Sequence, residues 1–260
     1  MSEIIELQSV VKLLEKTNSK LIKAPLVPSV VTEAVPGMPK SIFKFKPISV
    51  CEVFGYQIAE AIGVRVPQMQ GFWIRKALRS KRFDADPGRI GILVKYHEDW
   101  KPLGREYAVE LDVVQAARAL ALCVFDRFEW GEFGLSGGKV YFVDLERLLP
   151  PMQPEALLAA SEIDRMEELN YLAVGYGNVS FSAIGEVLEE AEQLGLQVRV
   201  EQELQRLCHL KSDTYCRFLE ISGHPLDKLL SHFAAFVFGN RLNSIAGWFD
   251  LPTHEVPDWR

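Results

Sequence analysis

Residues 42–67 read IFKFKPISVCEVFGYQIAEAIGVRVP, and this stretch decides the fold. It opens with an aromatic run that carries Lys44 and Lys46, and the period-two alternation of strand side chains places both lysines on one face. A helix is predicted over residues 50–62, with Glu52 in its first turn and a glycine, a usual C-terminal cap residue, just after its end. The stretch therefore predicts a strand that leads directly into a helix.

Further strands are predicted on both sides of this stretch. They are short runs of β-branched and aromatic residues, separated by prolines and glycines that are typical of turns. Before the helix they cover residues 21–23, 29–32 and 41–46, and after it residues 69–74 and 90–96, with a basic loop over 75–89. The first hundred residues are thus expected to form an antiparallel sheet with one helix inserted after the third strand.

From residue 106 onward the pattern becomes helical. A long buried helix is predicted over 107–125, then a loop over 126–138 and a strand over 139–144. Helices are predicted over 154–168, 180–194, 201–210, 213–222 and 225–238, and an irregular tail after Asn240. We therefore expect an α+β, two-lobed protein: an N-terminal helix over 1–19, a sheet lobe over 20–100 and a helical lobe over 101–260.

The composition excludes several classes of protein. With 48% hydrophobic residues among 260, the chain can bury enough apolar surface to fold. Its net charge of -6, from 29 basic and 35 acidic residues, disfavours nucleic acid as a partner. No apolar run reaches about 18 residues, so no membrane association is expected, and the acidic start is unlike a signal peptide. The four cysteines lack metal-ligand spacing, and we expect reduced thiols in a cytoplasmic protein.

Four charged positions follow one another in an order that suits phosphoryl transfer. The needed charges come from four places: a lysine on a strand, Glu52 on the next helix, Asp126 after the long helix and Asp144 after an apolar strand. The transferred group is multiply anionic and magnesium seeks oxygen ligands, so the chemistry requires one lysine and several carboxylates. Each residue also has a simpler interpretation, as a solvated edge lysine or as an acid favoured at a helix end.

The stretch over 42–67 resembles the lysine-strand and helix block of the atypical kinases, which include the HipA-type toxin kinases and the phosphatidylinositol 3- and 4-kinase-like group. Residues 91–97 resemble the hinge strand whose backbone holds adenine, residues 125–127 the catalytic loop, and residues 141–144 the metal-binding strand end. The positions that match in the first block are Glu52, Tyr56, Ala59, Gly63, Val66 and Pro67. The resemblance covers about residues 20 to 150 and implies a bilobal protein-kinase-like fold.

The resemblance also implies an ATP- and Mg²⁺-dependent phosphotransferase that acts on a serine or threonine hydroxyl of a protein. Its implied catalytic residues are Asp126 and Lys44, with Lys46 as the competing phosphate-binding lysine. Glu52 would pair with that lysine. The remaining implied residues are Lys95 and Tyr96 for the nucleotide, and Asp144 with Glu132 for the metal.

Two alternatives stay open. The loop over 126–132 reads DRFEWGE, where the family usually has a histidine and a metal-binding asparagine, and Glu129 competes with Glu132 as a substitute oxygen ligand. This departure favours a pseudokinase that binds nucleotide or a protein partner without transfer. The motif-free helical half is compatible with a third reading, a scaffold without ligand. For His97, a structural role is expected.

Overall fold

The computed structural model describes residues 21–23, 28–32, 39–44, 49–74, 77–79, 84–85, 87–125, 132–143, 145, 148–211, 224–256 and 258–259. Within these ranges the chain is an α+β protein whose sheets are antiparallel, in agreement with the fold class expected from the sequence. The helices predicted over 1–19 and 213–222 lie outside the described residues.

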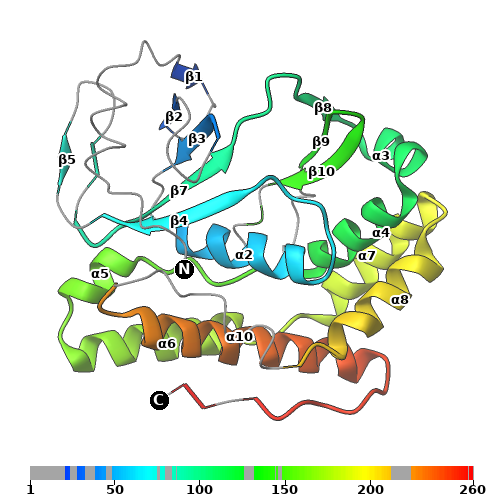
Figure 1. The fold of residues 1–260 in the computed structure, drawn as a ribbon. Coiled ribbons are helices and arrows are strands. Elements are labelled where there is room, and N and C mark those ends of the chain that lie inside the picture. Colours follow the sequence, from blue (N-terminus) through cyan, green and yellow to red (C-terminus); the bar gives the residue numbers. More distant parts are fainter. Residues whose placement is uncertain are drawn as a thin grey trace.

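A five-stranded antiparallel sheet forms from the N-terminal part of the chain (Figure 1). Its order is β1-β2-β3-β7-β4, so that β7 lies between β3 and β4. The register pairs Lys44 of β3 with Ile92 of β7, and Ser41 with Lys95. The strands are β1 (Leu21–Lys23), β2 (Pro28–Thr32), β3 (Ser41–Lys44), β4 (Met69–Trp73) and β7 (Ile90–Lys95), as the β-branched runs predict. The predicted basic loop over 75–89 contains two short paired strands, β5 (Leu78–Arg79) and β6 (Asp84–Ala85).

The helix α2 (Ser49–Ala61) lies against this sheet and contacts β4 and β7. Nearly all of its residues are buried, because the sheet covers one side and the helical part of the molecule covers the other. Phe54 packs edge to face on Phe238, with ring centroids 5.6 Å apart. A side chain at Gly55 would meet the carbonyl oxygen of Leu145 at 2.0 Å, so the backbone of α2 lies directly on the segment after the second sheet.

A second, three-stranded sheet has the order β10-β9-β8. It contains β8 (Lys101–Leu103), β9 (Glu132–Ser136) and β10 (Lys139–Val143). The predicted loop over 126–138 was therefore wrong in its second half, where β9 pairs with both neighbours. A glycine obscured this strand: Gly134 weakens the strand pattern, but it is required because a side chain there would overlap the ring of Trp100.

The long helix predicted over 107–125 is in fact broken. It consists of α3 (Arg105–Leu111), α4 (Val113–Leu122) and the 3₁₀ turn η1 (Cys123–Phe125). The break falls at Asp112, whose carboxylate accepts a hydrogen bond from the backbone N–H of Gln115 and so starts a new helix. An acid that caps a helix is indistinguishable in sequence from an acid on a helix surface, and for this reason the break was not predicted.

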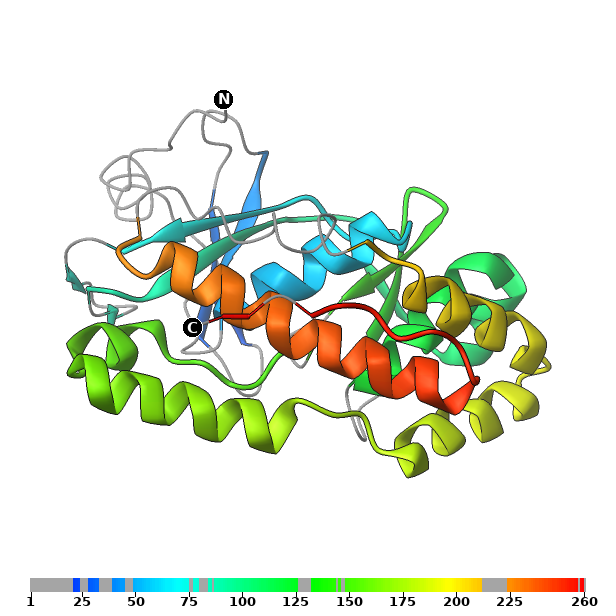
Figure 2. The ribbon, with the colours of Figure 1, turned by 90° about the horizontal axis from the view of Figure 1, so that it is seen from below.

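The remaining helices are α5 (Pro154–Ala159), α6 (Glu162–Tyr176), α7 (Phe181–Gln193), α8 (Gln197–Cys208) and α10 (Asp227–Trp248). The single helix predicted over 154–168 is interrupted at Ser161, which caps α6. The prediction of an irregular tail after Asn240 was also wrong, because α10 continues to Trp248 and buries Leu242, Ile245 and Ala246. Seen from below, α10 crosses the molecule between α6 and the sheet-bearing half (Figure 2).

One contiguous hydrophobic core runs from α2 to the C-terminal tail, with Val50 and Trp259 among its members. The passage from β7 to β8 is the point where the chain leaves the first sheet for the second, close to the boundary predicted at residue 100. None of the helices in the described ranges combines the length and apolar character needed to cross a membrane.

Candidate functional site

An ion pair joins the third strand to the helix that follows it. The Nζ of Lys44 donates to Oε1 of Glu52 at 2.6 Å, between the last residue of β3 and the first turn of α2. The side chain of Glu52 is 0% exposed and that of Lys44 is 20% exposed. The carboxylate is thus enclosed by the fold, whereas the Lys44 side chain is partly exposed.

This geometry follows from local sequence. Glu52 lies in the first turn of α2, where the helix dipole favours a carboxylate. Its desolvation is offset by the charge-assisted hydrogen bond from Lys44. Of the two lysines that the sequence leaves in competition, Lys44 makes this contact, and Lys46 lies outside the described residues.

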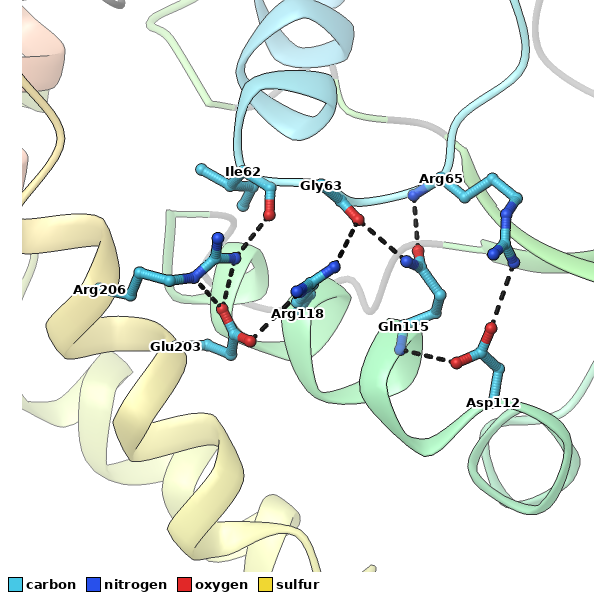
Figure 3. A network of polar contacts seen from close by, with 8 residues as sticks. All are labelled: Ile62, Gly63, Arg65, Asp112, Gln115, Arg118, Glu203 and Arg206. Carbon is cyan, nitrogen blue, oxygen red and sulfur yellow. Dashed lines mark hydrogen bonds and ion pairs between the residues drawn. The ribbon is translucent and has the colours of Figure 1, made fainter.

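The opposite end of α2 is held by side chains from two other helices (Figure 3). The carbonyls of Ala59 and Glu60 accept from the backbone N–H groups of Val64 and Gly63, whereas the carbonyls of Ile62 and Gly63 accept from side chains. Arg118 of α4 donates to the carbonyl oxygen of Gly63 at 3.0 Å, and Gln115 donates to the same oxygen at 2.9 Å. Arg206 of α8 donates to the carbonyl oxygen of Ile62 at 2.5 Å. Cations at a helix C-terminus also interact favourably with its dipole.

Glu203 and Asp112 connect these donors into one network. Glu203 accepts from both Arg118, at 3.2 Å, and Arg206, at 2.5 Å. Asp112 accepts from Arg65 at 3.2 Å, and the backbone N–H of Arg65 donates to Gln115 at 2.6 Å. The helix that carries Glu52 is therefore fixed at its far end to α4 and α8, which favours a constant position for the ion pair.

Lys95 and Tyr96, the residues predicted to hold a nucleotide base, lie at the end of β7. Both backbone N–H groups already have acceptors within the chain. The N–H of Lys95 donates to the carbonyl oxygen of Gln68 at 2.8 Å, and the N–H of Tyr96 donates to the carbonyl oxygen of Lys40 at 2.8 Å. The ammonium of Lys40 also lies over the Tyr96 ring, 5.2 Å from its centroid. A base bound at this point would have to use groups other than these two donors.

The structure describes only one of the three carboxylate residues predicted to act in catalysis or metal binding, and of that residue only the backbone. Asp126 and Asp144 lie outside the described residues, and of Glu132 only the backbone, at the start of β9, is described. Among the described residues no group of three or more histidine, cysteine or acidic side chains is placed to hold a metal ion. The metal ligands expected from the sequence therefore stay a prediction.

Arg241 of α10 contacts the segments next to both aspartates. Its guanidinium lies over the ring of Phe125, 5.8 Å from the centroid, and donates to the carbonyl oxygen of Leu148 at 2.8 Å. Arg241 is 5% exposed, and a buried arginine requires such partners. The sequence analysis missed it, because residue 241 was assigned to an irregular tail.

A second polar cluster links the end of β7 to the β9–β10 turn, and no motif in the sequence indicates it. Nδ1 of His97 lies 2.7 Å from Oγ of Ser136, and this hydroxyl donates to Oδ1 of Asp99 at 2.6 Å. The backbone N–H of Gly137 donates to the other oxygen of Asp99 at 2.7 Å. The Tyr141 ring lies 4.9 Å from the His97 ring. These side chains come together only because β9 and β10 fold back toward β7.

The proton positions in this cluster argue against a catalytic triad. Since the hydroxyl of Ser136 donates to Asp99, Nδ1 of His97 must carry a proton and donate to Ser136. A nucleophilic serine requires the opposite arrangement, in which the imidazole accepts the hydroxyl proton. Burial and, secondly, the charge of Lys95 lower the pKa of His97. The cluster thus joins the segment after β7 to the β9–β10 turn through hydrogen bonds of His97 and Asp99.

Comparison with known proteins gives no match for the chain among family models, curated proteins or solved structures.

Proposed function

We propose that the chain is an ATP- and Mg²⁺-dependent phosphotransferase with a bilobal, protein-kinase-like fold, and that its acceptor is a serine or threonine hydroxyl of a protein. The observation that carries this proposal is the ion pair between Lys44 and Glu52. In protein kinases the lysine that binds the nucleotide phosphates lies on the third strand and pairs with a glutamate of the next helix. Lys44 ends β3 and Glu52 begins α2, which is the same relationship.

The chemical role of Lys44 follows from the different exposure of the two partners. A lysine side chain is flexible, and a phosphate-binding ammonium must be held at one place to stabilise charge that develops during transfer. Glu52 is enclosed, and it belongs to a helix whose far end is anchored by Arg118 and Arg206. The ammonium of Lys44 is thus oriented by the ion pair, and the Lys44 side chain stays partly exposed, as binding of an anion would require.

Asp126 and Asp144 would provide the remaining chemistry. Phe125, just before Asp126, is buried, and β10 ends directly before Asp144. Arg241 contacts both Phe125 and Leu148, and this contact between the two chain segments supports a shared role for them. Asp126 would orient the acceptor hydroxyl and take up its proton. Asp144, together with Glu132, would hold Mg²⁺, which when bound neutralises charge on the phosphate oxygens.

A second candidate function is a nucleotide-binding pseudokinase that acts through protein interaction. It is favoured by the loop over 126–132, which contains neither asparagine nor histidine. Such a protein would keep the pair of Lys44 and Glu52 and would bind ATP without transferring phosphate.

The experiment that tests both functions is a thermal shift with ATP and Mg²⁺ followed by a transfer assay with γ-labelled ATP. Binding at a hundredfold excess over Kd stabilises the folded state by about 2.7 kcal/mol. We expect this shift in the wild type and its loss in Lys44→Met. Lys101→Met is the matched control, because Lys101 is an exposed strand lysine of the second sheet, at the start of β8.

Transfer to a serine- and threonine-containing protein substrate, abolished by Asp126→Asn with the thermal shift retained, would support the enzyme. A thermal shift without transfer in the wild type would support the pseudokinase instead. The absence of any shift at millimolar Mg·ATP, or an equal loss in Lys101→Met, would contradict both.

A further inference from the structure

The outer face of α6 carries three large apolar side chains that the fold does not cover. Ile163 and Tyr171 are each 73% exposed, and Val174 is 85% exposed. At 100° per residue these three positions fall within one narrow sector of the helix, which also contains Glu167. They form a stripe about 16 Å long, from the rise of 1.5 Å per residue. We call this stripe the α6 face.

The α6 face is not needed to hold the helix in place. The opposite side of α6 buries Leu169 and Leu172 in the hydrophobic core. Figure 2 shows α6 at the margin of the molecule beside α10, with no other ribbon on its outer side. Single exposed apolar residues are common, but three large ones in one sector of a single helix indicate an interaction surface, even with Glu167 between them.

Carboxylates lie within and beside the N-terminal half of this stripe. The exposed acids of α6 are Glu162, Asp164, Glu167 and Glu168. The only basic residue of the helix is Arg165, whose guanidinium donates to the carbonyl oxygens of Leu157, at 2.7 Å, and Ala160, at 3.1 Å. Arg165 thus serves the α5–α6 turn and does not face the stripe. The surface combines apolar contact area with a local excess of negative charge.

We infer that the α6 face docks a basic amphipathic segment of another protein. Apolar side chains of such a segment would cover Ile163, Tyr171 and Val174, and its lysines or arginines would lie against the flanking carboxylates. A second copy of this chain fits the surface poorly, because a two-fold contact pairs this face with itself, and the only basic residue of α6, Arg165, is held at the α5–α6 turn. This inference rests on α6 alone and does not depend on the proposed phosphotransferase activity.

The test uses the full chain and a labelled helical peptide of about 18 residues, built from leucine at helical spacing and lysine elsewhere. A peptide with glutamate in place of every lysine is the control probe. Fluorescence anisotropy is expected to show micromolar binding of the lysine peptide alone, weakened at high salt. Tyr171→Ser with Val174→Ser, and separately Glu167→Lys with Glu168→Lys, are each expected to raise Kd at least about tenfold.

Two control variants separate the α6 face from general attraction to an acidic protein. Val198→Ser removes an apolar side chain that is 66% exposed on α8. Glu186→Lys with Glu189→Lys makes the same change of charge on the exposed side of α7. Both should leave Kd unchanged.

The inference is overturned if the lysine peptide fails to bind, or if the α7 charge reversal weakens binding as much as the α6 charge reversal. It is also overturned if sedimentation equilibrium shows a dimer that dissociates in the Tyr171→Ser, Val174→Ser variant, because the occupant is then a second copy. Circular dichroism of each variant checks that α6 still folds.

Discussion

Lys44 and Glu52 are eight residues apart in the chain, yet the ammonium of one lies 2.6 Å from the carboxylate of the other across a strand–helix junction. The contact is asymmetric, since only the lysine reaches solvent. A buried carboxylate that loses its cation destabilises the folded state, because the attraction that offset its desolvation is gone. The pair therefore links the stability of the sheet–helix junction to the candidate site.

The first prediction concerns this asymmetry. Lys44→Met should lower the free energy of unfolding by about 3 kcal/mol, because Glu52 stays buried with its main cation removed. Lys44→Met combined with Glu52→Leu should recover most of this loss, because no charge is then buried. Urea unfolding of the two single variants and the double variant measures the coupling. Equal and additive losses would show that the pair is not coupled.

The anchor at the far end of α2 gives a second prediction. Arg118→Ala removes the charged donor to the Gly63 carbonyl and one partner of Glu203, and it should lower the free energy of unfolding by about 2 kcal/mol. Arg199→Ala on the exposed side of α8 removes an equal charge and should have little effect. Guanidinium unfolding of both variants, compared with wild type, measures the difference. If Arg199→Ala costs as much, the effect is one of net charge.

The third prediction compares two glycines, at which alanine should change the free energy of unfolding in opposite directions. A side chain at Gly134 would lie 1.9 Å from the ring of Trp100, so Gly134→Ala must displace that ring and should cost about 2 kcal/mol. At Gly185, in the middle of α7, a side chain meets nothing within 4 Å. Gly185→Ala should therefore stabilise the protein by about 0.8 kcal/mol. Differential scanning calorimetry measures both changes, and a stabilising Gly134→Ala would disprove the packing of Trp100 on β9.

The fourth prediction concerns pH. Burial lowers the pKa of His224 below its ordinary 6.5, and burial with the charge of Lys95 lowers the pKa of His97. Below about pH 6.5 the unfolded chain then binds more protons than the folded chain, so the free energy of unfolding falls as pH decreases toward the two folded pKa values. Urea unfolding between about pH 7.5 and pH 5.5 should show this decline.

The histidines can be separated by substitution. His224→Asn combined with His97→Asn should flatten the decline, whereas His209→Asn, at an exposed position, is the control. If the free energy of unfolding of the double variant falls with pH as steeply as that of the wild type, groups other than these two histidines cause the fall.

The sequence predicted the elements whose signals are local. Six strands and α2 were predicted near their observed bounds, because β-branched runs, helical periodicity and capping glycines act within a few residues. Misassignments fell where a tertiary contact overrides the local signal. β9 contains Gly134, which is required by Trp100, and α10 continues past Asn240 because its last turns are buried in the core.

The candidate site divides in the same way. The order of Lys44, Glu52, Asp126 and Asp144 could be read directly from the sequence, as could the resemblance that gives them roles. The engaged N–H groups of Lys95 and Tyr96 could not be read in this way, because their partners at Gln68 and Lys40 are fixed by the sheet.

The sequence by itself thus determined a strand–helix junction with basic and acidic residues on either side of it. It did not determine which lysine meets Glu52, and the structure describes that contact for Lys44. Only the tertiary structure brings Arg118 and Arg206 to the end of α2, and His97 to Ser136 and Asp99. The physical reason is that strand and helix patterns depend on neighbouring residues, whereas these contacts join positions 37 to 144 residues apart that meet only after the core has packed.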